Sequence, residues 1–391
     1  MAERKNIALF FSYNEGWIGG TYYILSLINA LNLIADEKKP TLIIVCNTDD
    51  EYEIVKQTNY PYLIQYSIAN VQLHFKQTII ERVINKVSNA LFNKNVFNKK
   101  QQLNFPDNVE AIFPCPQMNT FSDVNKSLFW IPDFQEYYFP ELFNNNIDEK
   151  NWRYNFGKFI ATNGLSLVVS SHTVNNDFNI IYPNNIASVV VMPFAVSHPP
   201  YEHLNIATLK EKYQINKKYF FSPNQFWKHK NHALVIEAAH LLIQKGIKNF
   251  QIVFSGKEAD FRNPNYIHEL KSKVKEYQLQ DYILFLGFID RKEQLQLMNH
   301  ALAVIQPSLF EGWSTVIEDA KAMNQNVLAS NIDVHKEQIL TYGGILFEKE
   351  NPKSLADCVE ACLTITPKKP NYNYVVDKLH FGNKFLEIVS N

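Results

Sequence analysis

One stretch of the chain indicates both its architecture and its ligand: Pro307-Ser-Leu-Phe-Glu311-Gly-Trp-Ser-Thr-Val-Ile-Glu318-Asp-Ala-Lys321. The apolar segment 301–305 before it predicts a strand, and the residues after Gly312 predict a helix with Glu318 near its start. The open N–H groups and the positive dipole end of such a helix suit an anion. Two carboxylates beside an anion site fit a ligand with both phosphates and hydroxyls, as in a nucleotide sugar. The alternative is an ordinary strand–turn–helix in which Glu318 is a first-turn acid.

This stretch resembles the signature of retaining glycosyltransferases of family 4 (glycosyl transferases group 1), in an E-G-W-S-T variant. The family continues with a small-residue helix and a strand ending in Ala-Ser, as the segment 327–330 does here. The resemblance implies the GT-B fold, in which two Rossmann-like, doubly wound α/β domains face a cleft and a C-terminal helix crosses back. One departure is that six residues separate Glu311 from Glu318, where the family has seven.

The resemblance also assigns roles within this stretch. Glu311 would contact the donor sugar and take part in catalysis, and Glu318 would bind the ribose hydroxyls. Since the spacing differs from that of the family, the turn before the helix is tighter by one residue, which affects the amides that face the ligand. The other donor-binding residues here would be Gly312 and, through their backbone amides to the diphosphate, Ser314, Thr315 and Val316.

Length and composition limit the class of protein. The 391 residues suit two domains, and 46% hydrophobic residues argue against disorder. A net charge of −1 argues against a role of the whole protein in binding nucleic acid. The four cysteines form no Cys-x-x-Cys pair, so we expect no zinc site or disulfide, and a reducing cytoplasm fits. Without an apolar signal region or 18 consecutive apolar residues, we expect no membrane span.

Apolar runs alternate with helical patterns along the chain, which predicts α/β domains with parallel sheets. The pattern restarts after the proline-bearing stretch 189–200, which we interpret as a linker. We expect an acceptor-binding Rossmann-like domain at 1–192, a nucleotide-sugar-binding Rossmann-like domain at 193–373 and a crossover helix at 374–391. Strands are predicted at 7–12, 41–46, 111–113, 128–131, 167–170, 219–222, 251–255, 283–286, 301–305, 327–329 and 344–347.

Gly19 and Gly20 stand between the first predicted strand and the first predicted helix. Glycines there let the backbone approach a ligand closely, and the helix behind them directs its N-terminus to the same place. The alternative is a plain tight turn, since the dinucleotide fingerprint G-x-G-x-x-G is absent. The pair resembles the Gly-Gly loop of the family, which lies against the diphosphate and the acceptor.

A basic loop at 221–232 opens the second half of the chain. Cations there would stabilise the charge that grows on a diphosphate leaving group. The family has an Arg followed five residues later by a Lys; Lys230 matches the Lys, whereas Gln225 replaces the Arg. Either Lys228 supplies the missing charge or stabilisation of the diphosphate is weaker. The alternative for the whole loop is a solvated basic surface.

Other segments also resemble parts of the family site. Ser255 and Gly256 end a strand and resemble its donor loop, and Phe288 would lie beside the nucleotide base, with an ordinary strand end as the alternative. Asp133 belongs to the first-domain side of the cleft, where it either hydrogen-bonds a sugar or caps a helix. Many relatives have His-Asp there, but this chain has Pro132, so the role of that histidine is not carried over.

The segment 75–91 predicts an amphipathic helix with a basic rim. An amphipathic basic helix can lie on an anionic membrane or receive a lipid-linked acceptor. The alternative is a helix packed on its own sheet, with solvated lysines. One helical face carries Ile80, Val83, Ile84, Val87 and Leu91, and the surrounding basic residues are Lys76, Arg82, Lys86, Lys94, Lys99 and Lys100.

The resemblance therefore implies a retaining, metal-independent glycosyltransferase. It would move a hexosyl group from a nucleoside diphosphate donor to a hydroxyl of a polysaccharide or lipid-linked glycan, for instance in lipopolysaccharide biosynthesis, with Glu311, Lys230 and Asp133 as catalytic residues. We expect no cofactor beyond the donor substrate, no nucleic-acid partner, and a cytoplasmic location, with the inner face of the membrane as a candidate. Two other classes fit as well. A GT-B sugar-nucleotide epimerase would share the donor site, and a catalytically silent carbohydrate-binding partner in glycan assembly would suit the departures at Gln225 and Pro132.

Overall fold

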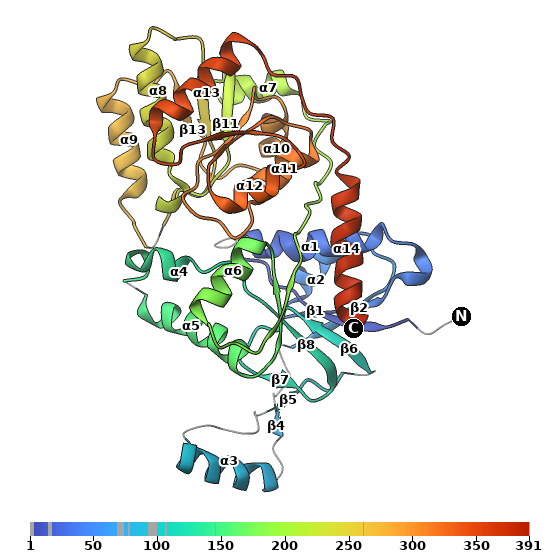
Figure 1. Ribbon diagram of the computed structural model, residues 1–391. Helices are drawn as coiled ribbons and strands as arrows, with labels where there is room; N and C mark the ends of the chain where they lie inside the picture. Colours follow the sequence, from blue (N-terminus) through green and yellow to red (C-terminus); the bar gives the residue numbers. More distant parts are fainter. Residues whose placement is uncertain are drawn as a thin grey trace.

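The computed structural model describes residues 4–14, 18–68, 74–76, 79–92, 100–105, 108–144, 146–260 and 262–390. The chain forms two α/β domains that lie one above the other, each around its own parallel sheet (Figure 1). This arrangement agrees with the architecture that the alternating apolar and helical patterns predict.

The sheet of the first domain has the strand order β10-β9-β8-β6-β1-β2-β3, and its neighbouring strands run parallel. Apolar runs such as Leu42–Val45 are fully buried, because helices cover both faces of such a sheet. The strands are β1 (Asn6–Phe10), β2 (Thr41–Cys46), β3 (Leu63–Ser67), β6 (Val109–Phe113), β8 (Val124–Trp130), β9 (Ser166–Val169) and β10 (Ser188–Val191).

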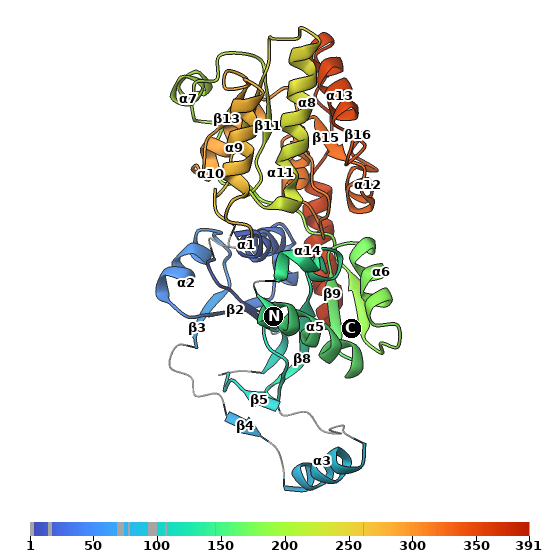
Figure 2. The ribbon, with the colours of Figure 1, turned by 90° about the vertical axis from the view of Figure 1, so that its left-hand side faces the viewer.

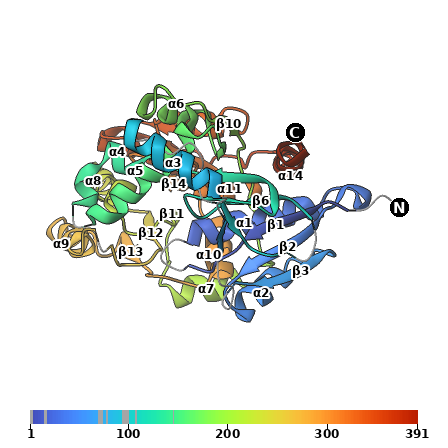
Figure 3. The same cartoon turned by 90° about the horizontal axis from the view of Figure 1, so that it is seen from below.

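The helices of the first domain are α1 (Ile18–Asn32), α2 (Asp49–Lys56), α3 (Ile79–Phe92), α4 (Gln135–Tyr138), α5 (Ile147–Thr162) and α6 (His172–Ile181), with the 3-10 turns η2 (Asp36–Lys38) and η3 (Pro140–Phe143). A small sheet of β4 (His74–Lys76), β5 (Lys100–Gln102) and β7 (Thr120–Phe121) lies at the end of this domain remote from the second domain. Helix α3 projects from the same end (Figures 1 and 2), and Figure 3 views the molecule from that side.

The sheet of the second domain has the order β13-β12-β11-β14-β15-β16, which is the strand order of a Rossmann domain. Its strands are β11 (Tyr219–Ser222), β12 (Gln251–Phe254), β13 (Ile283–Phe285), β14 (Val304–Gln306), β15 (Val327–Ser330) and β16 (Ile345–Phe347). Its helices are α7 (Ile206–Lys212), α8 (His232–Gln244), α9 (Tyr266–Glu276), α10 (Arg291–Asn299), α11 (Thr315–Ala322), α12 (Asp333–Ile339) and α13 (Pro352–Thr364), with the 3-10 turn η4 (Lys228–Lys230).

The C-terminal helix α14 (Val375–Ser390) returns to the first domain, as predicted (Figure 1). Phe381 and Phe385 are fully buried in the first-domain core, in the same cluster as residues of α1 and β1. A Cβ at Gly382 would lie 3.0 Å from the backbone of Ala30, so the absence of a side chain there lets α14 and α1 cross closely. The helix therefore belongs structurally to the first domain although it ends the chain.

Several features of the structure depart from the sequence-based expectations, among them the short strands β4, β5 and β7, which were not predicted. The expected linker from Val189 begins with strand β10, which pairs in parallel with β9, so the irregular passage between the domains follows Val191. Strand β3 was not predicted, and its mixed burial explains why, because no continuous apolar run marks it. Gly19 and Gly20 lie in the first turn of α1 rather than in a loop before it.

Candidate active site in the interdomain cleft

A cavity of about 470 Å³ lies between the two domains. Its walls come from segments that follow β1, β8 and β9 in the first domain and β11, β12, β13 and β14 in the second. Parallel α/β sheets bind ligands at this carboxyl edge. Of the predicted site residues, Gly20, Lys228 and Glu318 do not line the cavity. Those that line it are Gly19, Asp133, Gln225, Lys230, Ser255, Gly256, Phe288, Glu311, Gly312, Ser314, Thr315 and Val316.

Lys230 and Glu311 form an ion pair in the second-domain wall, with 2.6 Å between Lys230 Nζ and Glu311 Oε1. Gln306 Nε2 donates to the same carboxylate oxygen at 2.8 Å. The side chains of the pair are 14% and 10% exposed, so water screens them little. Turn η4 and the segment between β14 and α11 thus hold a cation and a carboxylate in fixed positions at the cleft.

The first turn of α11 presents open backbone amides to the cleft. The amides of Thr315 and Val316 have no hydrogen-bond acceptor within the described residues, and both residues line the cavity. Ser314 caps the helix, since its hydroxyl accepts from the amide of Ile317 at 3.4 Å. The amide of Ser314 itself donates to Gln338 Oε1 at 2.9 Å. Two of the three predicted anion-binding amides are therefore open, and the one of Ser314 is already occupied.

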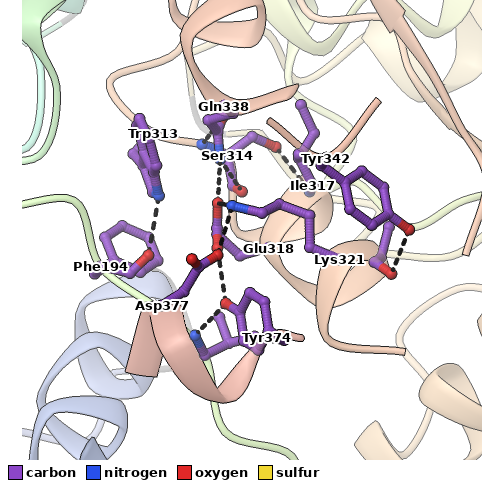
Figure 4. Close-up of polar contacts among 12 residues, drawn as sticks. Phe194, Trp313, Ser314, Ile317, Glu318, Lys321, Gln338, Tyr342, Tyr374 and Asp377 are labelled. Atoms are coloured by element: carbon purple, nitrogen blue, oxygen red, sulfur yellow. Dashed lines mark hydrogen bonds and ion pairs between the residues drawn. The ribbon is translucent and has the colours of Figure 1, made fainter. Parts of the chain in front are cut away.

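Glu318 does not reach the cleft. It is 1% exposed and its carboxylate is hydrogen-bonded to Tyr374, Gln338 and Lys321 (Figure 4). Burial raises the pKa of this carboxyl above its usual value, although these neighbours act against the rise. The prediction that Glu318 binds a ribose is thus at odds with its position in the structure, because the first turn of α11 directs this side chain into the protein.

Asp319, the next residue, lines the cavity. Its Oδ1 accepts from Arg291 at 2.5 Å and lies 2.9 Å from His198 Nε2. Burial acts to raise the pKa of Asp319, but Arg291 and His198 outweigh it and the pKa lies below the usual value. Seven residues separate Glu311 from Asp319, which is the spacing of the family signature, so counting from Glu311 would have identified it.

The second cation of the cleft is Arg291, which the sequence did not indicate. Its guanidinium lies 5.2 Å from the ring centroid of Tyr22 in the first domain, and it donates to Gln294 at 2.7 Å. Gln225, which replaces the Arg of the family, lines the cavity, whereas Lys228 is exposed on η4 and does not. The geometry therefore does not support Lys228 as the substitute charge.

Asp133 faces the cleft from the first domain. Its Oδ1 lies 2.6 Å from the guanidinium of Arg153, which also pairs with Glu136 at 2.6 Å. The same oxygen accepts from the amide of Gln135 at 3.2 Å, at the start of α4. Asp133 therefore supports the start of α4, and it also lines the cavity, where its hydrogen bond to a sugar stays a prediction.

The two walls of the cleft touch at Gly312. A Cβ built on this glycine would lie 1.8 Å from the carbonyl oxygen of Pro132 and 3.1 Å from Asp133 Cβ. Within the second domain, a Cβ at Gly256 would lie 2.2 Å from the carbonyl oxygen of Asn224. Gly256 and Gly312 are thus required by close backbone contact, and Gly312 allows the domains to meet.

Phe288 is 60% exposed at the cleft, so it does not belong to a core.

Helix α3 lies away from the cleft. Its apolar residues Ile80, Val83, Ile84 and Val87 are 71%, 57%, 39% and 54% exposed. The alternative that these residues pack on the sheet of their own domain is therefore wrong. Lys94 and Lys99 fall outside the described residues, as do the side chains of Lys76, Arg82, Leu91 and Lys100.

In the part of the chain that the structure describes, no helix combines the length and the hydrophobicity that a membrane span needs. Within the same residues, no group of three or more His, Cys, Asp or Glu side chains is arranged to hold a metal ion.

Comparison with known proteins agrees with this geometry. Residues 205–374 match the family described as Glycosyl transferases group 1. The O-antigen chain mannosyltransferase RfbU of Salmonella typhimurium (strain LT2) is 22% identical over 277 residues, which cover 69% of this chain and 70% of that protein.

Two solved structures are similar to this chain over nearly its whole length. Alr3699/HepE of Anabaena, in complex with UDP and glucose, has a TM-score of 0.62 at 14% identity and covers 99% of this chain and 100% of its own. WaaG, a glycosyltransferase involved in lipopolysaccharide biosynthesis, has a TM-score of 0.61 at 12% identity, with coverage of 99% and 100%. Residues 205–374 therefore match the glycosyl transferases group 1 family, in a chain that has the GT-B fold.

Proposed function

We propose that the protein is a retaining glycosyltransferase that moves a hexosyl group from a nucleoside diphosphate sugar to a hydroxyl of a polysaccharide or lipid-linked glycan. The observation that carries the proposal is the second-domain wall of the cleft. There the Lys230–Glu311 pair lies beside the open amides of Thr315 and Val316. A cation and helix-terminal amides suit a diphosphate, and a fixed carboxylate suits sugar hydroxyls.

The chemistry follows from where charge develops. As the bond between the sugar and the diphosphate of the donor breaks, negative charge grows on the leaving diphosphate. Lys230 and the backbone amides of Thr315 and Val316 stabilise this charge. These groups are fixed by the fold before the donor binds, so little reorganisation is needed during the reaction. They also carry the diphosphate charge without a metal ion, which makes metal independence part of the proposal.

Retention of configuration requires the acceptor hydroxyl to attack from the face that the diphosphate leaves. The leaving phosphate oxygen then lies close enough to take the proton of that hydroxyl. Asp133, held by Arg153 on the opposite wall, is proposed to hydrogen-bond a sugar hydroxyl and orient it. Asp319 takes the ribose-binding role that the sequence assigned to Glu318, because it is the acid that lines the cleft.

The choice of acceptor class rests on the relatives. The Salmonella relative is named as acting on the O-antigen chain, and WaaG as acting in lipopolysaccharide biosynthesis. HepE binds UDP and glucose, which supports a hexose donor. We therefore propose a surface-glycan acceptor and a site of action in the cytoplasm, at the inner face of the membrane.

The test is product analysis with radiolabelled UDP-glucose, UDP-galactose and GDP-mannose, each with and without a lipid-linked glycan extract. Transfer yields free nucleoside diphosphate and a glycoside whose anomeric proton coupling, measured by NMR, gives the configuration. A changed sugar nucleotide without acceptor would instead indicate an epimerase. Binding without turnover of any of these donors would indicate a silent carbohydrate-binding partner. Loss of activity in EDTA that added Mg²⁺ restores would contradict metal independence.

We propose further that α3 attaches the protein to an anionic lipid surface. Its face of Ile80, Val83, Ile84 and Val87 is exposed, and Lys86 beside it is exposed as well. Exposed apolar residues on one helical face insert at the headgroup boundary, and each nearby cation adds about 1 kcal/mol of attraction to anionic lipid. An exposed apolar face with a cation beside it suits the surface of an anionic membrane rather than that of a neutral one.

Sedimentation with phosphatidylglycerol vesicles tests this attachment. We expect the protein to sediment with them at low salt, less so at high salt, and not with phosphatidylcholine vesicles. Replacing Val83 and Val87 by Ser should abolish sedimentation. The matched control is Leu340→Ser, which removes an apolar side chain that is 84% exposed on the second domain. If the unchanged protein stays in solution, or if the control variant has the same effect, the attachment by α3 is wrong.

A further inference from the structure

A buried hydrogen-bond network joins the donor-binding wall to the segments that connect the two domains (Figure 4). Its centre is Glu318, whose two carboxylate oxygens have different partners. Glu318 Oε2 accepts from the hydroxyl of Tyr374 at 2.7 Å. The same hydroxyl accepts from the backbone amide of Val196 at 2.8 Å. Because Val196 lies on the passage into the second domain and Tyr374 on the return before α14, Glu318 connects to both passages.

The other carboxylate oxygen connects Glu318 to the donor-binding turn. Glu318 Oε1 accepts from Gln338 Nε2 at 3.0 Å. Gln338 binds the backbone of Ser314 on both sides, since it accepts from the amide at 2.9 Å and donates to the carbonyl at 3.0 Å. Ser314 directly precedes Thr315 and Val316, whose open amides face the cleft. The orientation of these amides is therefore tied to Gln338 and, through it, to Glu318.

Further contacts stabilise this connection. Lys321 Nζ lies 3.2 Å from Glu318 Oε1 and 3.0 Å from Asp377 Oδ2 at the start of α14. Trp313, which lines the cleft, donates from Nε1 to the carbonyl of Phe194 at 3.0 Å, on the same passage as Val196. Glu318, Gln338 and Tyr374 are 1%, 2% and 6% exposed, so water does not compete for these hydrogen bonds.

We infer that Glu318 is a positioning residue for donor binding. It holds Gln338 and hence the Ser314 backbone so that the Thr315 and Val316 amides point at the donor phosphates, and it couples that orientation to the passages between the domains. The inference rests on the proposed function, because it assumes a nucleoside diphosphate in the cleft. It also gives Glu318 a role that differs from direct ribose binding, since the residue acts through another side chain and the backbone.

The experiment compares the binding of UDP and GDP with that of uridine and guanosine by titration calorimetry. Glu318→Gln keeps the size of the side chain but removes its charge and places a donor group against Gln338 or Tyr374. We expect this variant to bind the diphosphate about tenfold more weakly, which corresponds to about 1.4 kcal/mol, and to leave the affinity for the nucleoside within about twofold. A purely structural role would lower both affinities together or neither. The matched control is Glu276→Gln on α9, where the acid is exposed and remote from the cleft.

Tyr374→Phe tests the coupling independently, because it removes the hydroxyl shared by Glu318 and Val196 and keeps the ring. We expect a smaller loss of diphosphate affinity, and an effect in the double variant that is less than the sum of the single effects, since the residues act as one unit. If Glu318→Gln does not fold, the Tyr374→Phe result alone decides, with unchanged diphosphate affinity counting against the inference.

The failure of the inference differs from the failure of the proposed function. If the unchanged protein binds the diphosphates and both variants bind them equally well, Glu318 does not position the donor site, while the proposed function stands. If both variants weaken binding but their effects are strictly additive, the coupling of the donor site to the passages between the domains is overturned. If the unchanged protein binds neither UDP nor GDP, the proposed function and the inference fall together.

Discussion

Substitution of Gly312 by Ala tests whether the observed contact between the domains is part of the catalytic state. The added Cβ would lie 1.8 Å from the carbonyl oxygen of Pro132, whereas ordinary contacts begin at 3.4 Å. The loop that carries Glu311 or the opposing Pro132–Asp133 segment must therefore withdraw by about 1.6 Å. A misplacement of about 1 Å at a reacting centre can cost about a hundredfold in rate. We expect Gly312→Ala to lower kcat by about a hundredfold or more.

The affinity for the donor should fall much less, because Lys230 and the amides of Thr315 and Val316 belong to one domain and do not depend on closure. The assays are steady-state kinetics of glycosyl transfer and calorimetric titration with the nucleoside diphosphate. Gly344→Ala is the matched control, since a Cβ there meets its nearest atom, a methyl of Ile339, at 3.3 Å, outside the cleft. A kcat of Gly312→Ala within about threefold of the unchanged protein would refute the reasoning, and so would an equal loss in the control.

Three further predictions concern single side chains. Lys230→Ala should lower kcat by about a hundredfold or more. The kcat of Lys228→Ala should stay within about twofold of the unchanged protein, because Lys228 is exposed and lies outside the cavity. Equal losses in the two variants would contradict the assignment of Lys230 as the cation that binds the diphosphate. Asp319→Asn should weaken donor binding about tenfold, as the loss of one charge-assisted hydrogen bond predicts, and unchanged affinity in calorimetry would remove Asp319 from the site. Burial lowers the pKa of His232 from 6.5 to about 3, so the unfolded chain takes up a proton as the pH falls below 6.5 and the folded chain does not. Stability is thus lost with falling pH, by about 2 kcal/mol between pH 7.5 and 5, and denaturant unfolding of His232→Leu should show that much less pH dependence.

The sequence determined the α/β architecture because the signals involved are local. Buried parallel strands appear as continuous apolar runs, and 41–46 and 219–222 were predicted with the bounds that the structure gives. The strand–turn–helix around Glu311 was recognisable for the same reason, since its turn, cap and carboxylate are close in sequence. Strand β3 has only partly buried residues and no such run, which is why it was missed.

The position of the second acid depended on helix geometry that a motif does not specify. Glu318 and Asp319 are neighbours, but successive residues of an α-helix point about 100° apart. Both side chains are 1% exposed, but Asp319 lies at the wall of the cleft and Glu318 lies against Gln338 and Tyr374. Which acid takes which position depends on where the helix begins. The structure places the start at Thr315, and this start directs Asp319 to the cleft and Glu318 to Gln338 and Tyr374.

What only the tertiary structure decided are the contacts between residues far apart in the chain. Arg291 lies beside Asp319 and Tyr22, Asp133 beside Arg153, and Gly312 against Pro132. No local pattern marks these pairs. Arg291–Asp319 and Asp133–Arg153 form only when their own domain is folded, and the contacts of Arg291 with Tyr22 and of Gly312 with Pro132 form only when the two domains face each other. The sequence by itself determined the two domains, the segments that carry Lys230 and Glu311, and the presence of a helix after Glu311 whose N-terminus suits an anion. The first residue of that helix and the packing within and between the domains decided which side chains meet in the cleft, since both depend on distances that a linear sequence does not contain.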